Sequence, residues 1–487
     1  MSFRPIKVLK AEQSQEAISL RELPWKYGEM GLLYPSAQIT KRDGQIRYEI
    51  IEPDLSKQEM EKEMALRKSL FYTLKPESLA VGADDAEVAT RMLDLLKKSV
   101  DKSTYPKIGY YLVRDIVRYD SLTAFLDDPD IEDLSYSAMD QSVKVFHREY
   151  STWLDTNLDI SLEDADYLVQ RIALKCGKSV SIAIPMLDAM SPEGYRVSIT
   201  FSKEISPPGS TFSVRKPATE FWTLPELIVD KRMMTPEMGA ALWYTLQNRG
   251  VVLVVGRPGT GKTTLMNSAL TVLPTSWKMV TVEEIPEIHI LHPNWLRLIT
   301  RRSSTFLEAS EKVEISLDKL LPHTLRVRPD IVSVGEVRTK SEIKEFIQAV
   351  AAGNGGITSM HAEDFDSLKA RFNYADVDDS FFSLVTFVLF LNAFEVRGKL
   401  IRRVQEMGEV VLKDGKATYN SLATYNLAKD SYVQNVYDSV RMAKLASING
   451  LSKDDLLKDL GRRKDFIGRS ASLKGNEFVE ELRQFYG

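Results

Sequence analysis

The sequence predicts an α/β protein built from more than one domain. Its 487 residues, of which 44% are hydrophobic, exceed what one core of ordinary size holds, so two or three domains are expected. After residue 235, short apolar segments alternate with helical patterns, which is typical of a mostly parallel sheet covered by helices. There the apolar run VVLVV leads into a glycine-rich loop and a further helical segment.

Composition and charge exclude several classes of protein. The one cysteine, Cys176, excludes an internal disulfide framework and any multi-cysteine zinc site. A net charge of -4 argues weakly against a general nucleic-acid binder, because such proteins usually carry a basic face, and it leaves a local basic patch open. We expect no stable complex with nucleic acid. The apolar run at 384–391 is far shorter than the roughly 20 residues of a membrane-spanning helix. The start of the chain has no export signal, so we expect a cytosolic protein without a transmembrane segment.

Residues 1–115 are expected to form a mixed, largely helical extension. A hairpin is predicted within 37–53, because Asp43-Gly44 suits a tight turn and apolar residues alternate after it. Residues 84–100 carry an apolar stripe at helical spacing, made of Val88, Met92, Leu95, Leu96 and Val100. A solvated helical layer is the plain interpretation, and a partner-binding surface is the alternative.

Residues 116–217 are expected to form a compact α/β domain. Stretches rich in β-branched residues and bounded by Gly or Pro predict strands at 142–149, 179–187, 195–201 and 211–217. Between the first two, Ser161 is expected to cap a helix, with Asp164 completing a capping box and Gly177 ending the helix. The stretch 218–232, rich in Pro and polar residues, predicts a linker.

Residues 233–487 are expected to form the next unit. It begins with a helix that Thr235 caps, with Pro236 in its first turn and Gly250 at its end. The apolar strand follows at once, and further strands are predicted at 278–282, 329–335 and 356–361. The tail from about residue 430 is charged and mostly helical.

The loop after the apolar strand predicts a phosphate site. Residues 256–263 match G-x-x-x-x-G-K-[ST] between a strand and a helix, which is the context that the pattern demands. Backbone N–H groups and the helix N-terminus would surround a β-phosphate, Lys262 would reach the β- and γ-phosphates, and Thr263 would bind Mg²⁺. The sequence has no L-S-G-G-Q or N-K-x-D segment, which favours an adenine nucleotide. The residues expected to contact it are Gly256, Arg257, Pro258, Gly259, Thr260, Gly261, Lys262, Thr263 and Thr264.

Carboxylates and a histidine follow three strands of the predicted sheet. The segment MVTVEEIPEIHI places Glu283, Glu284 and Glu287 just beyond a strand end, where a carboxylate could orient an attacking water, although solvated charge is the plainer interpretation. Glu336, at the end of PDIVSVGE, suits Mg²⁺ and its waters. His361 ends the third strand, where a lone histidine is usually structural.

In this order, the segments resemble those of the hexameric motor ATPases of type II and type IV secretion, most closely the archaeal branch that drives pilus and archaellum assembly. The Walker A loop, acidic segment, Walker B strand and histidine segment of that family stand here at 256–263, 281–287, 330–338 and 353–361. Upstream, DDPDIEDLSYSAMDQSVKVFHREY and GKSVSIAIPMLDAMSPEGYRVSITF look like its N-terminal domain, so the match covers about 120–430. The resemblance implies a RecA-like P-loop domain preceded by a smaller, PAS-like α/β domain.

The family also implies roles for single residues. Glu287 matches the glutamate thought to act as general base on the attacking water, Glu336 the Walker B glutamate, and His361 the histidine that senses nucleotide state. Arginines of the family's N-terminal domain approach the phosphates, and Arg196 and Arg215 are the candidates here. A guanidinium stabilises transition-state charge, but plain surface charge is the alternative for both.

The chain departs from the family pattern at several points. Asn354 stands where most relatives begin the histidine segment with Gly-His, so the role of that histidine is lost or taken by an amide. Glu284 replaces the usual aspartate of the acidic segment. The tetracysteine insert of many bacterial relatives cannot exist with one cysteine, which favours the archaeal branch.

The resemblance implies a homohexameric cytosolic ATPase that uses Mg-ATP to power a pilus-like filament or a secretion machine. Its partner would be a membrane platform protein, which places it at the inner face of the cell membrane. The alternatives are a RecA-like nucleic-acid translocase, which would show a basic stripe or interleaved aromatic residues, and a non-catalytic nucleotide-gated scaffold. The joint presence of Lys262, Glu287 and Glu336 argues against the scaffold.

Overall fold

The computed structural model describes Val8 and residues 17–487, apart from 26, 43, 74–83, 151, 218–221, 291, 302–314 and 397–398. Asp43 of the predicted turn and residues 218–221 of the predicted linker therefore lie outside the described residues. The chain divides into two compact units, Met1–Thr219 and Glu220–Gly487, and each contains a nine-stranded sheet. The protein is thus a mixed α/β protein.

The sheet of the first unit has the strand order β1-β2-β3-β6-β5-β4-β9-β8-β7. Its strands are β1 (Ala17–Glu22), β2 (Ser36–Arg42), β3 (Gln45–Ile51), β4 (Ile131–Tyr136), β5 (Ser142–His147), β6 (Thr152–Asp159), β7 (Met186–Met190), β8 (Arg196–Thr200) and β9 (Thr211–Arg215). Its α-helices are α1 (Lys57–Thr73), α2 (Asp85–Lys97), α3 (Tyr105–Leu112), α4 (Thr123–Asp127) and α5 (Leu162–Lys175). Because β3 pairs with β6 in parallel, the N-terminal part of the chain contributes three strands to the same sheet as residues 131–215.

Several predictions for the first unit can be compared with its elements. The predicted hairpin is confirmed as β2 and β3, which pair antiparallel. The helical stripe of α2 is confirmed at Val88, Met92 and Leu96, but Leu95 is exposed and Leu93 is buried in its place. Val100 lies beyond the end of the helix at Lys97. The predicted strand at 179–187 is wrong over most of its length, because Ser181 and Ile184 close a tight turn and β7 begins at residue 186.

Helix α5 begins and ends close to where the sequence predicts. The Ser161 hydroxyl accepts from the backbone N–H of Asp164, but the Asp164 carboxylate accepts from that hydroxyl rather than from the Ser161 backbone, so the capping box is incomplete. Gly177 follows the helix in the left-handed region, with φ +70°. Cys176 lies between them, and burial raises the pKa of its thiol to about 12.

The sheet of the second unit has the order β12-β11-β13-β14-β10-β15-β16-β17-β18. Its strands are β10 (Val251–Gly256), β11 (Met279–Glu283), β12 (Trp295–Ile299), β13 (Ile331–Val334), β14 (Gly355–Met360), β15 (Val385–Val396), β16 (Lys399–Lys413), β17 (Lys416–Asn426) and β18 (Ser431–Gln434). The α-helices are α6 (Leu224–Val229), α7 (Pro236–Gln247), α8 (Lys262–Leu270), α9 (Leu317–Thr324), α10 (Lys340–Ala351), α11 (Phe365–Tyr374), α12 (Val440–Ile448), α13 (Lys453–Arg469) and α14 (Gly475–Tyr486). Strands β10 to β15 pair with one another in parallel, and β16 to β18 extend the sheet from β15 in antiparallel fashion.

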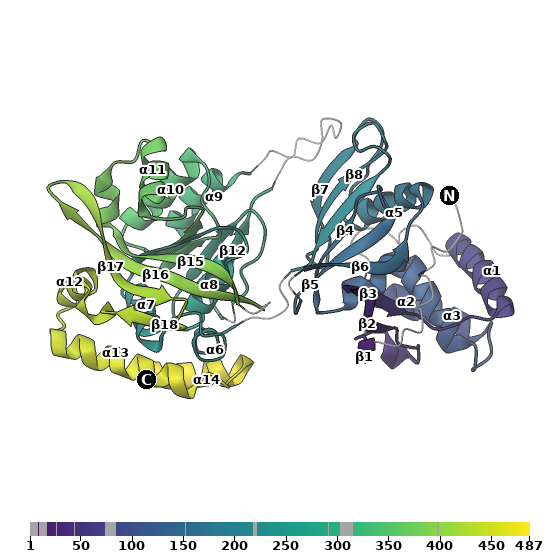
Figure 1. Ribbon diagram of the computed structural model, residues 1–487, viewed down its shortest axis with the longest axis horizontal. Coiled ribbons are helices and arrows are strands. Elements are labelled where there is room, and N and C mark those ends of the chain that lie inside the picture. The colour runs from purple at the N-terminus through teal and green to yellow at the C-terminus, as the bar shows by residue number, and fades with distance from the viewer. Residues whose placement is uncertain are drawn as a thin grey trace. The chain divides into compact units, whose positions relative to one another are not determined.

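Helices cover both faces of this sheet, which explains its unbroken apolar strands. Along β10, Val252 and Val254 pack in one core with α6, α7, α8, α13 and α14. Leu253 and Val255 pack in the other core, with α9, α10 and α11. Figure 1 shows α9, α10 and α11 on one side of the sheet and α6, α7, α13 and α14 on the other. In the described part of the chain, no helix combines the length and apolar character that crossing a bilayer requires.

Two predictions near the start of this unit need correction. Helix α7 is capped by Thr235 as expected, but Arg249, with φ +56°, takes the left-handed position after the helix that was assigned to Gly250. Part of the predicted linker is helical, because Thr223 and Glu226 form a capping box that starts α6. Helix α6 buries Leu224 in the core, so this stretch is anchored to the second unit.

Candidate active site

The order of the parallel strands brings the predicted functional segments to one edge of the sheet. Strand β14 lies between β10 and β13, and β11 lies next to β13. Since parallel strands end at the same edge, the loop after β10 meets the residues that follow the other three strands. The site is therefore assembled from segments more than 100 residues apart in the sequence, as from Gly256 to His361.

The loop after β10 depends on two glycines. A Cβ on Gly256 would lie 2.6 Å from the backbone oxygen of Leu391 on the neighbouring β15, so only glycine fits there. Gly261 precedes α8 with φ +92°, a left-handed conformation that favours glycine. Together they let the loop turn tightly from β10 into the N-terminus of α8, which directs unpaired N–H groups and positive potential outward.

Lys262 is buried at the start of α8, and its ammonium is held by the loop itself. Its Nζ donates to the backbone oxygens of Gly256 at 2.9 Å and Arg257 at 3.0 Å. His361 Nδ1 lies 3.1 Å from the same Gly256 oxygen and 3.4 Å from Lys262 Nζ. Burial lowers the pKa of Lys262, although the charges of Glu336 and Glu287 oppose the shift.

Glu336 lies between His361 and Arg338. Its Oε1 lies 2.6 Å from His361 Nε2, and its Oε2 accepts from Arg338 at 2.7 Å. Burial alone would raise the pKa of Glu336, but Arg338, His361 and Lys262 together lower it below its ordinary value. The carboxylate is therefore ionised over a wider range of pH than an ordinary glutamate.

The acidic segment after β11 meets α8. Glu287 Oε2 accepts from the Thr263 hydroxyl at 3.1 Å, and the Glu287 backbone oxygen accepts from Asn267 at 3.2 Å. Glu284 turns the other way and pairs with Arg338 at 3.2 Å. The structure thus brings together five of the predicted residues, which are Lys262, Thr263, Glu287, Glu336 and His361.

The two predicted arginines lie in the first unit. Arg196 on β8 and Arg215 on β9 are directly opposite each other in the antiparallel register. Arg215 Nε also donates to Asp133 on β4 at 2.7 Å. Their approach to a bound phosphate stays a prediction.

Two side chains that the sequence analysis did not assign to the site also contact the loop after β10. Arg402 on β16 donates from Nε to the backbone oxygen of Gly259 at 2.8 Å. Glu363, two residues after the histidine, accepts from Arg257 at 2.7 and 3.1 Å. Both contacts arise because strands that are distant in the sequence are close together in the sheet. No local pattern around Arg402 indicates its place beside the loop.

The donors at this edge fit a magnesium ion. Thr263, Glu287 and Glu336 present oxygen ligands only, which Mg²⁺ prefers. Glu336 Oε1 is buried and has no aligned hydrogen-bond partner, despite its short distance from His361. Among the described residues, no three His, Cys, Asp or Glu side chains converge as a metal cluster. An ion here would complete its shell with phosphate oxygens and water, as Mg²⁺ usually does.

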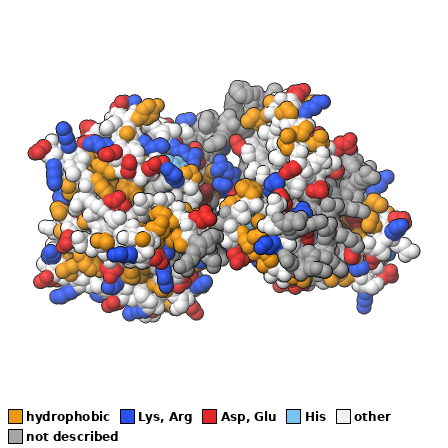
Figure 2. All heavy atoms as spheres, viewed as in Figure 1, with side chains coloured by type: hydrophobic (Ala, Val, Ile, Leu, Met, Phe, Trp, Pro, Cys, Tyr) orange, Lys and Arg blue, Asp and Glu red, His pale blue; other side chains and the backbone are white. Residues whose placement is uncertain are grey.

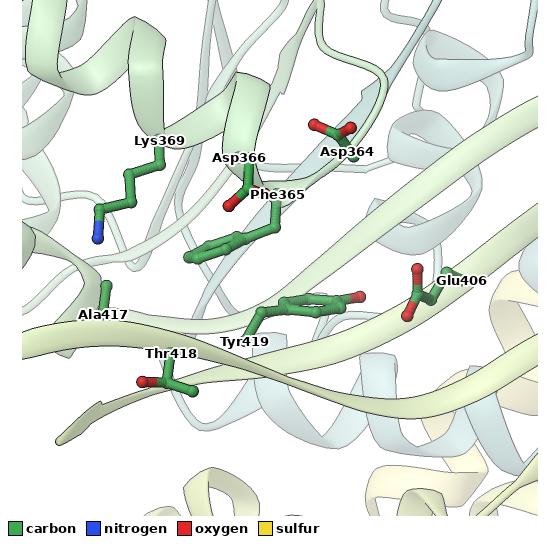
Figure 3. Close-up of a pocket in the computed structure, with 8 residues that line it drawn as sticks. All are labelled: Asp364, Phe365, Asp366, Lys369, Glu406, Ala417, Thr418 and Tyr419. Carbon is green, nitrogen blue, oxygen red and sulfur yellow. The ribbon is translucent and has the colours of Figure 1, made fainter.

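A separate cavity of about 460 Å³ opens beside the start of α11. It is lined by Asp364, Phe365, Asp366, Lys369, Glu406, Ala417, Thr418 and Tyr419. Figure 3 shows the rings of Phe365 and Tyr419 stacked, with centroids 5.2 Å apart, and the carboxylates of Asp364, Asp366 and Glu406 near them. This acidic lining would repel a phosphate, so the cavity does not compete with the loop after β10 as a nucleotide site.

Comparisons with known proteins agree with this arrangement. The family model described as "Type II/IV secretion system protein" matches residues 180–383. An uncharacterized protein of Methanocaldococcus jannaschii, MJ1287, is 30% identical over 273 residues, which are 54% of this chain and 97% of that protein. A second, MJ0900, is 28% identical over 392 residues, which cover 75% of this chain and 69% of the relative. The type IV secretion system protein PtlH of Bordetella pertussis is 29% identical over 234 residues, which cover 44% and 67%.

The two archaeal relatives agree with the expected archaeal branch. The residues that the family model matches include all four segments that meet at the sheet edge. The chain belongs to the type II/IV secretion system family of motor ATPases.

Proposed function

We propose that this chain is a motor ATPase with a RecA-like core that hydrolyses Mg-ATP. The observation that carries the proposal is the convergence of Lys262, the Thr263–Glu287 pair and the Glu336–His361 pair at the edge where β10, β11, β13 and β14 end. A phosphate-binding loop alone would indicate only a nucleotide. Two carboxylates beside it add the means of activating water.

Each residue has a role that follows from its contacts. Lys262, released from the Gly256 and Arg257 oxygens, would bind the terminal phosphates. Glu287 would accept a proton from the attacking water, since its carboxylate already lies beside Thr263. Glu336 would hold Mg²⁺ through its waters, and His361, in contact with both Glu336 and Lys262, would respond to the charge on the terminal phosphate. When bound, Mg²⁺ would neutralise charge that develops on the phosphate oxygens.

The wider machine is proposed from family membership. We expect a homohexamer on the cytosolic side of the membrane, working on a membrane platform protein to assemble a pilus-like filament such as the archaellum or to drive secretion. Arg196 and Arg215 would complete the site around the phosphates. On the face shown in Figure 2, Lys and Arg side chains are interspersed with Asp and Glu, which supports a motor acting on protein rather than on nucleic acid.

The proposal is tested by the Mg-ATPase rate per protomer against protein concentration. We expect the rate to rise steeply as chains associate, because the ring completes the site. The Lys262→Ala variant should lose at least about 100-fold in kcat, since it removes the charge that binds the phosphates. A rate that stays constant down to the monomer would contradict the ring, and near-normal turnover by Lys262→Ala would contradict the assigned site.

A further inference from the structure

Glu283 is a buried carboxylate at the end of β11 that has no role in the mechanism above. Its side chain is 1% exposed, and it makes three hydrogen bonds. Oε1 accepts from the backbone N–H groups of Glu287 at 2.8 Å and Ile288 at 2.6 Å. Oε2 accepts from Arg297 Nε on the neighbouring strand β12 at 3.0 Å. Glu283 thus joins the loop that carries Glu287 to a second strand of the sheet.

The loop after β11 is held by side-chain contacts rather than by regular secondary structure, and these include Asn267 on the Glu287 oxygen and Arg338 on Glu284. Residues 284–290 form neither helix nor strand. The Glu287 backbone N–H also contacts the Ile285 oxygen at 2.9 Å, and Ile288 is fully buried. The two N–H groups held by Glu283 are those of the candidate general base and of its buried neighbour. The carboxylate therefore fixes the N–H side of the Glu287 backbone, while Asn267 on α8 holds its oxygen.

Arg297 is itself held in place. Its guanidinium lies 5.3 Å from the Trp295 ring centroid, and the Trp295 Nε1 donates to Thr281 on β11 at 2.9 Å. Among the described strands, β12 is the edge strand of the sheet and pairs with β11. A chain of contacts therefore connects the edge of the sheet with the site, and it runs from Trp295 through Arg297 and Glu283 to Glu287.

We propose that Glu283, oriented by Arg297, is a positioning residue for Glu287. The proposal rests on the proposed ATPase function and deepens it. Placement of this kind has large effects on rate, because a shift of about 1 Å in a reacting group costs on the order of 100-fold. Burial raises the pKa of Glu283 despite its hydrogen bonds, so the ionised group is kept at some cost to stability, which is common at functional sites.

The test compares steady-state ATPase kinetics and nucleotide binding for four variants of the full chain. Glu283→Gln keeps an oxygen for the loop N–H groups but turns an amide donor toward Arg297, so one of the two attachments must break. Arg297→Lys keeps the positive charge. Glu287→Gln removes the base, and Glu283→Gln/Glu287→Gln combines the two changes.

We expect Glu283→Gln to lower kcat about tenfold or more, with KM and the affinity for a fluorescent ATP analogue changed less than about twofold. Arg297→Lys should retain more of the wild-type kcat than Glu283→Gln does. The double variant should be no slower than Glu287→Gln, because a residue that acts only through Glu287 has no further effect once that base is lost.

Glu409 offers a matched control in the same unit. It is also a fully buried carboxylate, and it accepts from the backbone N–H groups of Val440 and Arg441 at the start of α12. Glu409→Gln should leave kcat unchanged, whatever it does to thermal stability.

Four results would overturn the proposal. Wild-type kcat in Glu283→Gln would show that the loop does not need the carboxylate. Equal losses in kcat and nucleotide affinity, or a double variant much slower than Glu287→Gln, would show a general structural role instead. If the wild-type chain itself has no ATPase activity, the proposed function fails first, and the positioning role fails with it.

Discussion

The charge on Glu336 is controlled by its three cationic or potentially cationic neighbours. Arg338 contributes most among them, through a hydrogen bond of 2.7 Å as well as through its charge. The same guanidinium reaches Glu284 at 3.2 Å, so it links the Walker B strand to the acidic segment. An arginine two residues after a glutamate is a common sequence, and only the structure shows that it bridges two segments of the site.

Replacing Arg338 should change the pH dependence of turnover. A positive neighbour lowers the pKa of a carboxyl, so Arg338→Met should raise the pKa of Glu336. Because the proposed mechanism needs ionised Glu336, the acid limb of the kcat/KM profile should move to higher pH. Rates measured from about pH 4 to about pH 8 would check the shift. Lys340→Met is the control, since Lys340 pairs with Asp376 instead of Glu336, and an identical shift in both variants would contradict this assignment.

The side chains of the candidate site differ in how well their positions in it could be predicted from the sequence. Lys262 and Thr263 belong to a local pattern, so their role is predictable from eight consecutive residues. Glu287 and Glu336 needed the order of four segments and a family resemblance. Glu283 belongs to the same acidic segment, but nothing local shows that it points inward to two backbone N–H groups. The contact of Arg402 is harder still to predict, because it depends on the place of the antiparallel strand β16 in the sheet, which no local pattern shows.

Strand β14 separates two residues of the histidine segment that the sequence places close together. His361 follows its C-terminal end, in contact with Lys262 and Glu336. Asn354 precedes its N-terminal end, about 23 Å away at roughly 3.3 Å per residue. There the Asn354 amide donates to the Ala349 oxygen at 3.1 Å, which satisfies a carbonyl at the C-terminal end of α10. The Asn354 amide therefore supports a helix end.

Removing that amide should affect stability and spare catalysis. Asn354→Ala should lower the free energy of unfolding by about 1 kcal/mol, the usual contribution of one such hydrogen bond. Denaturant unfolding of the variant and its ATPase rate would be measured together. A variant with normal stability and a much lower rate would mean that Asn354 acts on the nucleotide site.

The secondary structure shows where local patterns are sufficient. Strand β10 and the helices begun by Thr235 and Ser161 were predictable, because a buried strand and a capped helix have strong local signatures. The segment 179–187 has strand composition, yet it turns at Ser181–Ile184 and leaves Ile182 exposed. Composition alone does not show whether a partner strand is available.

The last helix of the second unit, α14, is held to the rest of that unit by hydrogen bonds of Tyr486. The hydroxyl of Tyr486 accepts from the indole N–H of the fully buried Trp243 at 2.7 Å. It lies 2.7 Å from the Val272 oxygen and 3.2 Å from Gln247 Oε1, so its one proton serves one of these acceptors at a time. Helix α14 is thereby joined to α7 and to the segment that follows α8, on the face of the sheet opposite α10.

Tyr486→Phe should lower the free energy of unfolding by about 1–3 kcal/mol, because the buried Trp243 N–H loses its partner. Chemical denaturation followed by tryptophan fluorescence would measure the change. Tyr374→Phe, on a side chain that is 82% exposed, is the control and should be neutral. Equal stability of the two variants would show that Trp243 finds another acceptor.

The division into two units, each with its own sheet, is the feature that sequence indicated least completely. The sequence changes near residue 116 from helical patterns to short strand patterns, which predicts a domain boundary there, and that boundary stays a prediction. The structure shows that β1 to β3 belong to the same sheet as β4 to β9. Pairing between β3 and β6 joins residues more than 100 positions apart, a long-range contact with no local signature.

The half-buried thiol of Cys176 makes the protein convenient for optical measurement of motion between the units. With a pKa of about 12, it holds almost no thiolate near neutral pH and should react slowly with maleimide dyes. Cysteines introduced at the exposed positions Met139 and Tyr374, one in each unit, would then take up a donor and an acceptor dye selectively. Energy transfer between those dyes, measured with and without ATP, would test whether the proposed motor changes the distance between its two units, without removal of the native cysteine.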